Sequence, residues 1–187
     1  MGGEAVMEPD DEVLVQRARS GERAAFHALV RRHQARAIAF AARYLGASAP
    51  ANDAAQEAFV DLYLSLPRYR SQDRFRAYWH RLLLNRCRMS LRAGRIRETM
   101  HAGLTALPTL AVVPAETLLV AREREQAVQR SLETLSEKLR VVVALRFTAG
   151  LPLQDIADTL ELPLGTVKSR LFSGLAELRA TLKGQGE

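Results

Sequence analysis

The chain contains few of the residues that build disulfide-bonded or metal-dependent proteins. Cys87 is the single cysteine among 187 residues, so an intramolecular disulfide is excluded. His80 lies seven residues before it, and these two side chains alone do not make up the ligand set of a tetrahedral zinc site. We therefore predict a buried, apolar Cys87 in a protein of a reducing compartment, with no metal and no other cofactor.

Long apolar runs and catalytic signatures are also missing. No stretch approaches the roughly 18 consecutive apolar residues that span a bilayer, and the N-terminus is acidic where a secretory signal would be basic. The sequence has no phosphate-binding glycine loop, no nucleophile elbow and no HExxH motif. We predict a cytoplasmic protein without membrane insertion, without catalytic residues and without enzymatic activity.

Basic residues are in excess and are unevenly distributed. The net charge is +6, and the segment from Arg74 to Arg97 holds eight arginines and no acidic residue. Such segregation favours a surface for one kind of neighbour, and an arginine-rich surface favours a polyanion because each contact with a phosphate releases a counterion. Composition alone also fits a basic protein with no such partner.

Apolar residues recur at helical spacing along most of the chain, and no stretch shows the alternation of a strand. We predict an all-α protein of two small helical domains joined by a flexible linker. An acidic tail is expected at residues 1–10 and the first domain at 11–97. The linker is expected at 98–116, the second domain at 117–183 and a short tail at 184–187. In the first domain, helices are expected at about residues 11–20, 22–45, 53–66 and 74–92.

The predicted helix near residues 53–66, capped by Asn52 or Asp53, has two distinct faces. Its core face consists of Ala55, Phe59, Leu62, Tyr63 and Leu66. At 100° per residue, a second face gathers Asp53, Glu57, Val60 and Leu64. Two aliphatic side chains flanked by carboxylates fit a surface that docks another protein. They also fit a core that extends around a small bundle, and the residues alone leave both interpretations open.

The predicted helix at residues 74–92 has one apolar and one basic side. Its inward positions are Phe75, Trp79, Leu82 and Met89, and its opposite side holds Arg74, Arg81, Asn85, Arg88 and Arg92. Arginine contacts phosphates, asparagine reads base edges, and Tyr69, Tyr78 or Trp79 can stack on an unpaired base. A solvated face is the alternative, but the charge segregation favours nucleic acid.

Residues 153–182 have the length pattern of a helix-turn-helix, whose second helix enters the DNA major groove. A short helix from Leu153 to Leu160 and the turn Glu161–Leu162–Pro163 precede a longer helix with a core of Val167, Leu171, Leu175, Leu178 and Leu182. Its exposed positions are Thr166, Lys168, Ser169, Arg170, Phe172 and Ser173. Lysine and arginine suit phosphates or guanine, serine bonds to either, and phenylalanine contacts a thymine methyl group.

Three motifs in chain order carry a resemblance to a known family. GLPLQDIA at residues 150–157, followed by LPLGTVKSRL at 162–171, closely resembles region 4 of extracytoplasmic function (ECF) sigma factors. DAAQEAF at residues 53–59 looks like the polymerase-docking helix of region 2 in that family. FRAYW at residues 75–79, with the following arginine tract, looks like its promoter-melting segment. Together the motifs cover most of residues 11–183.

The resemblance implies a transcription initiation factor that binds core RNA polymerase and promoter DNA. The contacts expected with the clamp coiled coil of the largest subunit are Asp53, Gln56, Glu57, Val60 and Leu64. The residues expected to contact the minus-ten element are Tyr69, Arg70, Ser71, Gln72, Asp73, Trp79, Arg81, Asn85, Arg88 and Arg92. Those expected to contact the minus-thirty-five element are Thr166, Lys168, Ser169, Arg170, Phe172 and Ser173. The polymerase flap region and an anti-sigma factor are further expected partners.

The chain departs from the family pattern at two places. Ser173–Gly174–Leu175 stands where the family usually continues with arginine, and Pro50–Ala51–Asn52 replaces the usual acidic residue before the docking motif. Gly174 also costs about 1 kcal/mol of helix propensity. The alternative functions are a helix-turn-helix regulator that acts without polymerase and a nucleic-acid-processing enzyme. The absence of a nucleophile or metal constellation argues against the enzyme.

Overall fold

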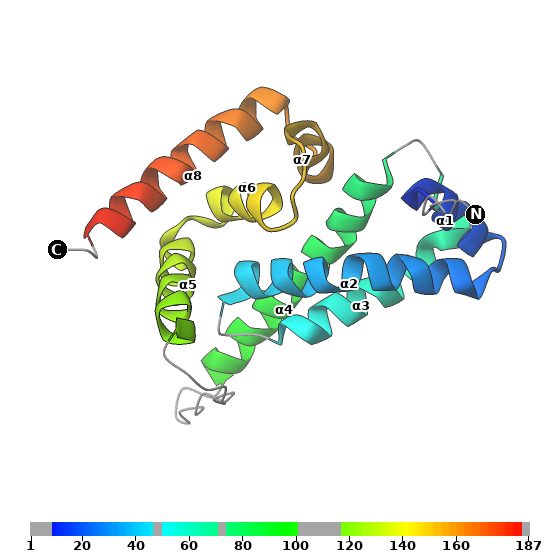
Figure 1. Ribbon diagram of the computed structural model, residues 1–187, viewed down its shortest axis with the longest axis horizontal. Helices are drawn as coiled ribbons and strands as arrows, with labels where there is room; N and C mark the ends of the chain where they lie inside the picture. Colours follow the sequence, from blue (N-terminus) through cyan, green and yellow to red (C-terminus); the bar gives the residue numbers. More distant parts are fainter. Residues whose placement is uncertain (1–8, 47–49, 71–73, 101–116, 185–187) are drawn as a thin grey trace, which may run out of the picture.

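The computed structural model describes residues 9–46, 50–70, 74–100 and 117–184, which form helices and short connections without a strand (Figure 1). We call residues up to 100 the first module and residues from 117 the second. The first contains α1 (Asp11–Arg19), α2 (Arg23–Leu45), α3 (Ala51–Ser65), the 3₁₀ turn η2 (Leu66–Arg68) and α4 (Phe75–Met100). The second contains α5 (Thr117–Thr134), α6 (Glu137–Phe147), α7 (Leu153–Leu160) and α8 (Leu164–Gly184). The all-α prediction is confirmed.

The helix ends follow from local chemistry. The Asp10 carboxylate accepts a hydrogen bond of 2.7 Å from the backbone N–H of Asp11, at the positive end of α1. Gly46, with φ +70°, follows the last residue of α2 in a conformation that glycine adopts without a steric penalty. Pro50, rather than Asn52 or Asp53, occupies the N-cap of α3, so the predicted cap lay two or three residues too late.

The first module is a bundle in which α2, α3 and α4 pack against one another and α1 packs on α2. Trp79 of α4 is 1% exposed and stacks on Phe59 of α3, with ring centroids 4.4 Å apart. Tyr44 and Phe40 of α2 stack 5.9 Å apart in the same core. All four aromatic side chains are buried and contribute large apolar surfaces to this core.

The second module consists of α5 and α6 against α8, with α7 completing the helix-turn-helix. Its helix boundaries at Leu153, Leu160 and Leu164 agree with those predicted. Gly174 lies buried where α8 crosses α6, and a Cβ atom there would come within 2.9 Å of Val143 Cγ2. The glycine that departs from the family pattern therefore permits a close approach of two helices.

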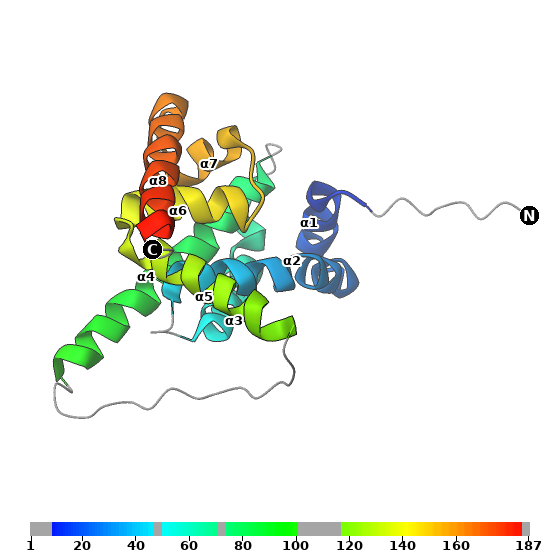
Figure 2. The ribbon, with the colours of Figure 1, turned by 60° about the vertical axis from the view of Figure 1, so that its left-hand side comes forward.

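The two modules lie against each other, which the sequence did not indicate. Helix α7 packs on α4 and α6 packs on α2, as the two ribbon views show (Figures 1 and 2). One continuous core includes Trp79 and Leu83 of the first module with Leu145 and Ile156 of the second. The predicted linker at residues 98–116 begins within α4, and its residues 101–116 lie outside the described part of the chain, as do residues 1–8 of the predicted acidic tail.

Three predicted core residues are instead at the surface. Tyr63 of α3 is 53% exposed, Met89 of α4 is 53% exposed and Leu182 of α8 is 40% exposed. Each lies at the edge of the apolar side of its helix, where neighbouring helices do not fully cover the side chain. Within the described residues, no helix has the length and hydropathy that a bilayer crossing requires.

Candidate polymerase-docking and promoter-binding surfaces

The second face of α3 is solvent-exposed, and we call Asp53, Gln56, Glu57, Val60 and Leu64 the docking face. Val60 is 56% exposed and Leu64 is 68% exposed, although both are aliphatic. Asp53, Gln56 and Glu57 are also exposed, one to two turns earlier on the helix. The interpretation of Val60 and Leu64 as core residues is therefore wrong. Exposed aliphatic side chains that adjoin carboxylates are typical of a surface that another protein covers.

An arginine of α4 organises the acidic part of the docking face. Arg86 forms a two-pronged ion pair with Asp61 and a longer one, 3.3 Å, with Glu57. Asp61 was not among the predicted site residues, although it lies one helical turn after Glu57, a spacing that places both carboxylates on one side of α3. Tyr63 was missed as well; it packs edge-to-face on Phe26, with centroids 5.1 Å apart, and adds aromatic surface next to Leu64.

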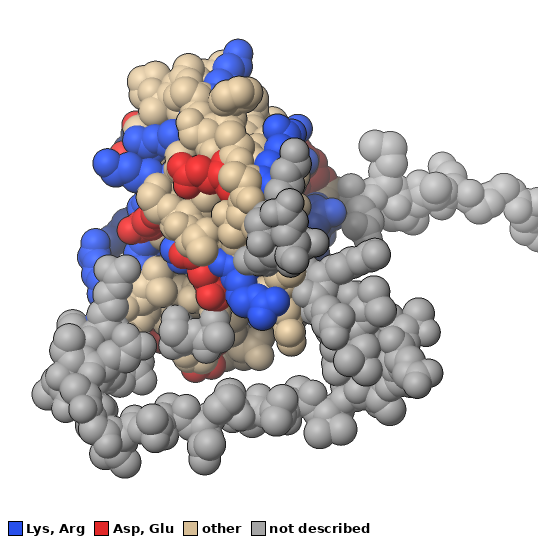
Figure 3. Space-filling view, turned by 90° about the vertical axis from the view of Figure 1, so that its left-hand side faces the viewer, with Lys and Arg blue, Asp and Glu red and all other residues tan. Residues whose placement is uncertain are grey.

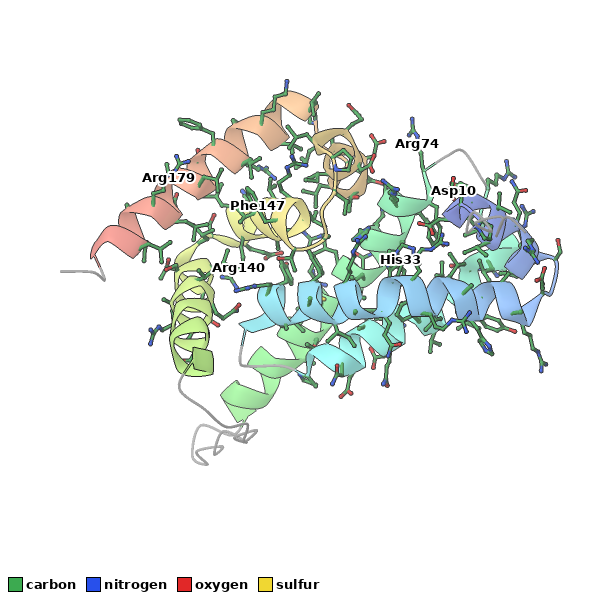
Figure 4. All side chains as sticks on the ribbon, in the orientation of Figure 1. Asp10, His33, Arg74, Arg140, Phe147 and Arg179 are labelled. Carbon is green, nitrogen blue, oxygen red and sulfur yellow. The ribbon has the colours of Figure 1, made fainter. Side chains whose placement is uncertain are left out.

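The basic side of α4 is present as predicted, and we call Arg74, Arg81, Asn85, Arg88 and Arg92 the basic stripe. Asn85 and Arg92 are exposed, whereas Arg81 and Arg88 are half-buried, and they pair with Glu161 after α7 and with Glu137 of α6. Arg74 lies immediately before the first residue of α4 (Figure 4). Four of the eight arginines between Arg74 and Arg97 therefore belong to this stripe, whereas Arg86 faces α3.

Two predicted minus-ten contacts lie inside the first module. Trp79 stacks on Phe59 in the core, so it has no face for a base, and its prediction as a DNA contact is wrong. Tyr69 is also buried, and its hydroxyl donates to Glu12 Oε1 at 3.0 Å. A period of four residues from Phe75 places Trp79 inward, a signal that already favoured the core over the base-stacking role. Ser71, Gln72 and Asp73 lie outside the described residues.

A basic hollow of about 350 Å³ lies where η2, α4 and α7 meet. Its lining residues are Arg68, Tyr69, Arg70, Arg74, Ala77, Tyr78, Arg81 and Asp158. The hollow combines guanidinium groups with the half-buried ring of Tyr78, a chemistry suited to a phosphate next to an unstacked base.

The start of α8 presents the predicted minus-thirty-five residues. Val167 is fully buried and fixes the orientation of the helix, while Lys168, Ser169, Phe172 and Ser173 are exposed. Phe172 is 74% exposed, the largest exposed fraction among the large apolar residues described. Thr166 and Arg170 are partly buried. By contrast, Lys and Arg intermix with Asp and Glu on the face of the molecule that Figure 3 shows.

A group of buried or partly buried titratable residues ties α1 to α2. Asp11 accepts hydrogen bonds from Arg32 at 2.7 Å and from His33 at 3.0 Å. Burial raises the pKa of Asp11, but these bonds and charges more than offset it and lower the pKa to about 2. His33 of α2 lies beside α4 in Figure 4. Because these groups satisfy one another inside the fold, their role is to hold α1 in place.

His80 and Cys87 are buried for separate reasons and do not form a metal site. Burial lowers the pKa of His80 to about 4, assisted by the positive charges of His33, Arg76 and Arg36. Its Nδ1–H donates to the Arg76 carbonyl oxygen at 2.7 Å. Burial raises the pKa of Cys87 to about 12, as expected of an unreactive core thiol. Among the described side chains, no three potential metal ligands of His, Cys, Asp or Glu come together.

Comparisons with known proteins agree with this architecture. The family model for Sigma-70 region 2 matches residues 29–96, and that for Sigma-70 region 4 matches residues 131–180. The chain is 33% identical over 173 residues to the ECF RNA polymerase sigma-E factor of Escherichia coli (strain K12), covering 87% of this chain and 88% of that protein. It is 30% identical over 171 residues, with the same shares covered, to the RNA polymerase sigma-H factor of Pseudomonas aeruginosa.

Solved structures extend the likeness to the fold. CnrH, solved in complex with the cytosolic domain of CnrY, superimposes with a TM-score of 0.72 at 26% identity, covering 93% of this chain and 97% of that chain. The sigma factor RpoE of Bartonella quintana, solved with the anti-sigma factor NepR, has the same fold with a TM-score of 0.61 at 21% identity, covering 83% and 97%. The match to both sigma-70 regions, together with the identity to the sigma-E factor over most of both chains, shows that this chain belongs to the ECF group of the sigma-70 family of RNA polymerase sigma factors.

Proposed function

We propose that the protein is a transcription initiation factor that carries core RNA polymerase to promoters and has no catalytic activity of its own. The observation that supports this most directly is the exposure of Val60 and Leu64 beside carboxylates on α3. A self-sufficient DNA-binding regulator has no need of such a face on the module that carries the basic stripe. An adaptor does need it, since one surface must hold the polymerase while others hold DNA.

Each of the three surfaces has its own binding partner in this proposal. The docking face binds the clamp coiled coil of the largest polymerase subunit. The basic stripe with the hollow beside Tyr78 binds the minus-ten element and captures unpaired bases, so that binding to the single strand makes melting favourable without ATP hydrolysis. The exposed start of α8, with Lys168 and Phe172, binds the minus-thirty-five element as a duplex, and the second module also contacts the polymerase flap region.

A charge placed on the docking face tests the proposal. Leu64→Arg leaves the core intact, since Leu64 is 68% exposed, and should abolish promoter-dependent transcription with core polymerase by weakening the complex. Val13→Arg is the matched control, because Val13 is 46% exposed on α1 and receives the same charge. Glu57→Arg should act in the same direction, with the added effect of a like charge beside Arg86.

Promoter binding with and without core polymerase distinguishes this function from that of a regulator that acts alone. If the purified chain binds promoter duplexes equally well with and without core polymerase, and Leu64→Arg changes nothing, the protein is a regulator that acts alone. A sigma factor should bind promoters mainly as holoenzyme. A regulatory partner is also part of the proposal, supported by the likeness to CnrH, which was solved with the cytosolic domain of CnrY. Co-expression with the product of a neighbouring gene should show a stable complex that blocks transcription.

A further inference from the structure

Acidic residues of the second module lie directly on the basic stripe of the first. Arg81 Nη1 lies 2.7 Å from Glu161 Oε1, and Arg81 Nη2 donates to the Asp158 carbonyl oxygen at 2.7 Å. Arg74 Nε lies 4.0 Å from Asp158 Oδ2. Helix α7 and the residue after it therefore bring carboxylates to the first half of the stripe, where the proposed function places DNA phosphates.

A second acidic contact covers the next part of the stripe. Glu137, in the first turn of α6, accepts from Arg88 Nε at 3.1 Å and from the Tyr44 hydroxyl at 2.9 Å. Arg74, Arg81 and Arg88 are thus all paired with the second module, while Arg92 lies one turn beyond and is exposed. The pairing follows the stripe along α4 and is not confined to one end.

The backbone at Glu161 is an unusual place for a glutamate. Its φ of +54° makes it the one residue other than glycine with positive φ in the described chain, at the turn between α7 and α8. Glycine or asparagine adopts this conformation at lower cost. In this conformation, at the C-cap of α7, the Glu161 side chain reaches Arg81.

The basic hollow supplies a further observation. Asp158 lines it together with Arg68, Arg70, Arg74 and Arg81, so a carboxylate of α7 occupies the margin of the hollow that suits a phosphate. Thr159, next in the chain, is buried against α4, with its hydroxyl 3.5 Å from the Ala77 carbonyl oxygen. The contact between the modules thus places the Asp158 carboxylate at the hollow to which the proposed function assigns the promoter strand.

We propose that Asp158, Glu161 and Glu137 act as an internal substitute for promoter phosphates, so that the free chain closes over its own minus-ten surface until DNA displaces these acids. This inference rests on the proposed role of the basic stripe. Partly exposed ion pairs are individually weak and are screened by salt, so the closure is reversible. The apolar contacts of Ile156 and Leu145 hold the modules together, and the charges decide which surface is covered.

Charge reversal in the full-length chain tests closure. Glu161→Arg places like charges together and should raise the radius of gyration measured by small-angle X-ray scattering, and Arg81→Glu added to it should restore the compact value. Glu177→Arg makes the same charge change on an exposed part of α8 and should leave the shape unchanged. Glu161→Gly relaxes the turn and removes the carboxylate without adding a like charge, so it should raise the radius of gyration less than Glu161→Arg does and leave the second module folded.

Single-stranded DNA binding tests masking. By fluorescence anisotropy, Glu161→Arg should bind a minus-ten oligonucleotide at least about threefold more tightly than Glu177→Arg, since both variants carry the same net charge. An unchanged radius of gyration in both Glu161 variants would refute the proposed closure of the two modules. A larger radius without tighter binding of the oligonucleotide would refute the proposed masking of the basic stripe. Neither result affects the polymerase dependence of promoter binding, which tests the proposed function separately.

Discussion

Substitution of Gly174 by alanine sets two effects of opposite sign against each other. Alanine in a helix interior gains about 1 kcal/mol over glycine from propensity. At this position, however, the added Cβ would lie 2.9 Å from Val143 Cγ2 and 3.5 Å from Leu139 Cβ. Val143 is buried and β-branched, so its methyl group has no alternative rotamer of low energy, and overpacking of this kind costs about 1–3 kcal/mol. We expect Gly174→Ala to destabilise the protein by about 1 kcal/mol.

A double-mutant cycle with Val143→Ala isolates the clash. Removing the Cγ atoms of Val143 leaves room for the new Cβ, so in that background Gly174→Ala should stabilise the protein by up to about 1 kcal/mol. The coupling between the two positions should therefore be about 2 kcal/mol. Urea unfolding of the four proteins at constant pH, followed by circular dichroism, measures it.

Gly94 provides the matched control. It lies in α4, and a Cβ atom added there would meet nothing within 4 Å, so Gly94→Ala should be stabilising. If Gly174→Ala stabilised the wild-type protein as much as Gly94→Ala does, the close approach of α6 and α8 would not require a glycine, and the account given for this departure from the family pattern would be refuted.

Three further changes test the buried histidine and the two DNA-binding surfaces. His80 has a pKa of about 4 in the fold against 6.5 for a solvated histidine side chain, so the unfolded chain takes up the proton first and stability falls as the pH drops from about 6.5 towards 4. The loss between pH 7 and pH 5 should be about 2 kcal/mol by urea unfolding and should vanish in His80→Leu, whereas Asp11, with a pKa of about 2, contributes only at lower pH. Asn85→Ala should reduce permanganate-detected melting in holoenzyme complexes more than it reduces closed-complex affinity, since its amide is proposed to hold an unpaired base; an equal loss in both would contradict that role. Lys168→Ala should weaken upstream duplex recognition by about 1–3 kcal/mol in holoenzyme footprinting, and an unchanged preference for the upstream element would exclude a base contact.

Local sequence patterns determined the helices and the faces that they carry. The boundaries of α7 and the beginning of α8 were predictable because a short amphipathic helix, a turn with Pro163 and a second apolar period leave little choice of register. The basic stripe was predictable because its members lie on one helix or, for Arg74, directly before it, and side-chain direction follows from 100° per residue. The docking face on α3 was visible for the same reason.

Which faces are covered was decided only by the tertiary structure. Periodicity left Val60 and Leu64 equally suited to a core, and the bundle placed Tyr63, Met89 and Leu182 at its margins, because a helix does not encode where its neighbours end. Periodicity placed Trp79 inward, but its stacking partner Phe59, 20 positions earlier in the sequence, was set by the packing of α3 on α4.

The sequence by itself thus determined two helical DNA-binding modules and the residues available on each helix. Only the tertiary structure decided that α7 lies on α4, because the pairs Arg81–Glu161 and Arg88–Glu137 join positions about 50 to 80 residues apart that no local pattern relates. It also showed why a glycine fits at position 174 within α8, since the distance between two crossing helices is a property of their packing and not of either sequence segment alone.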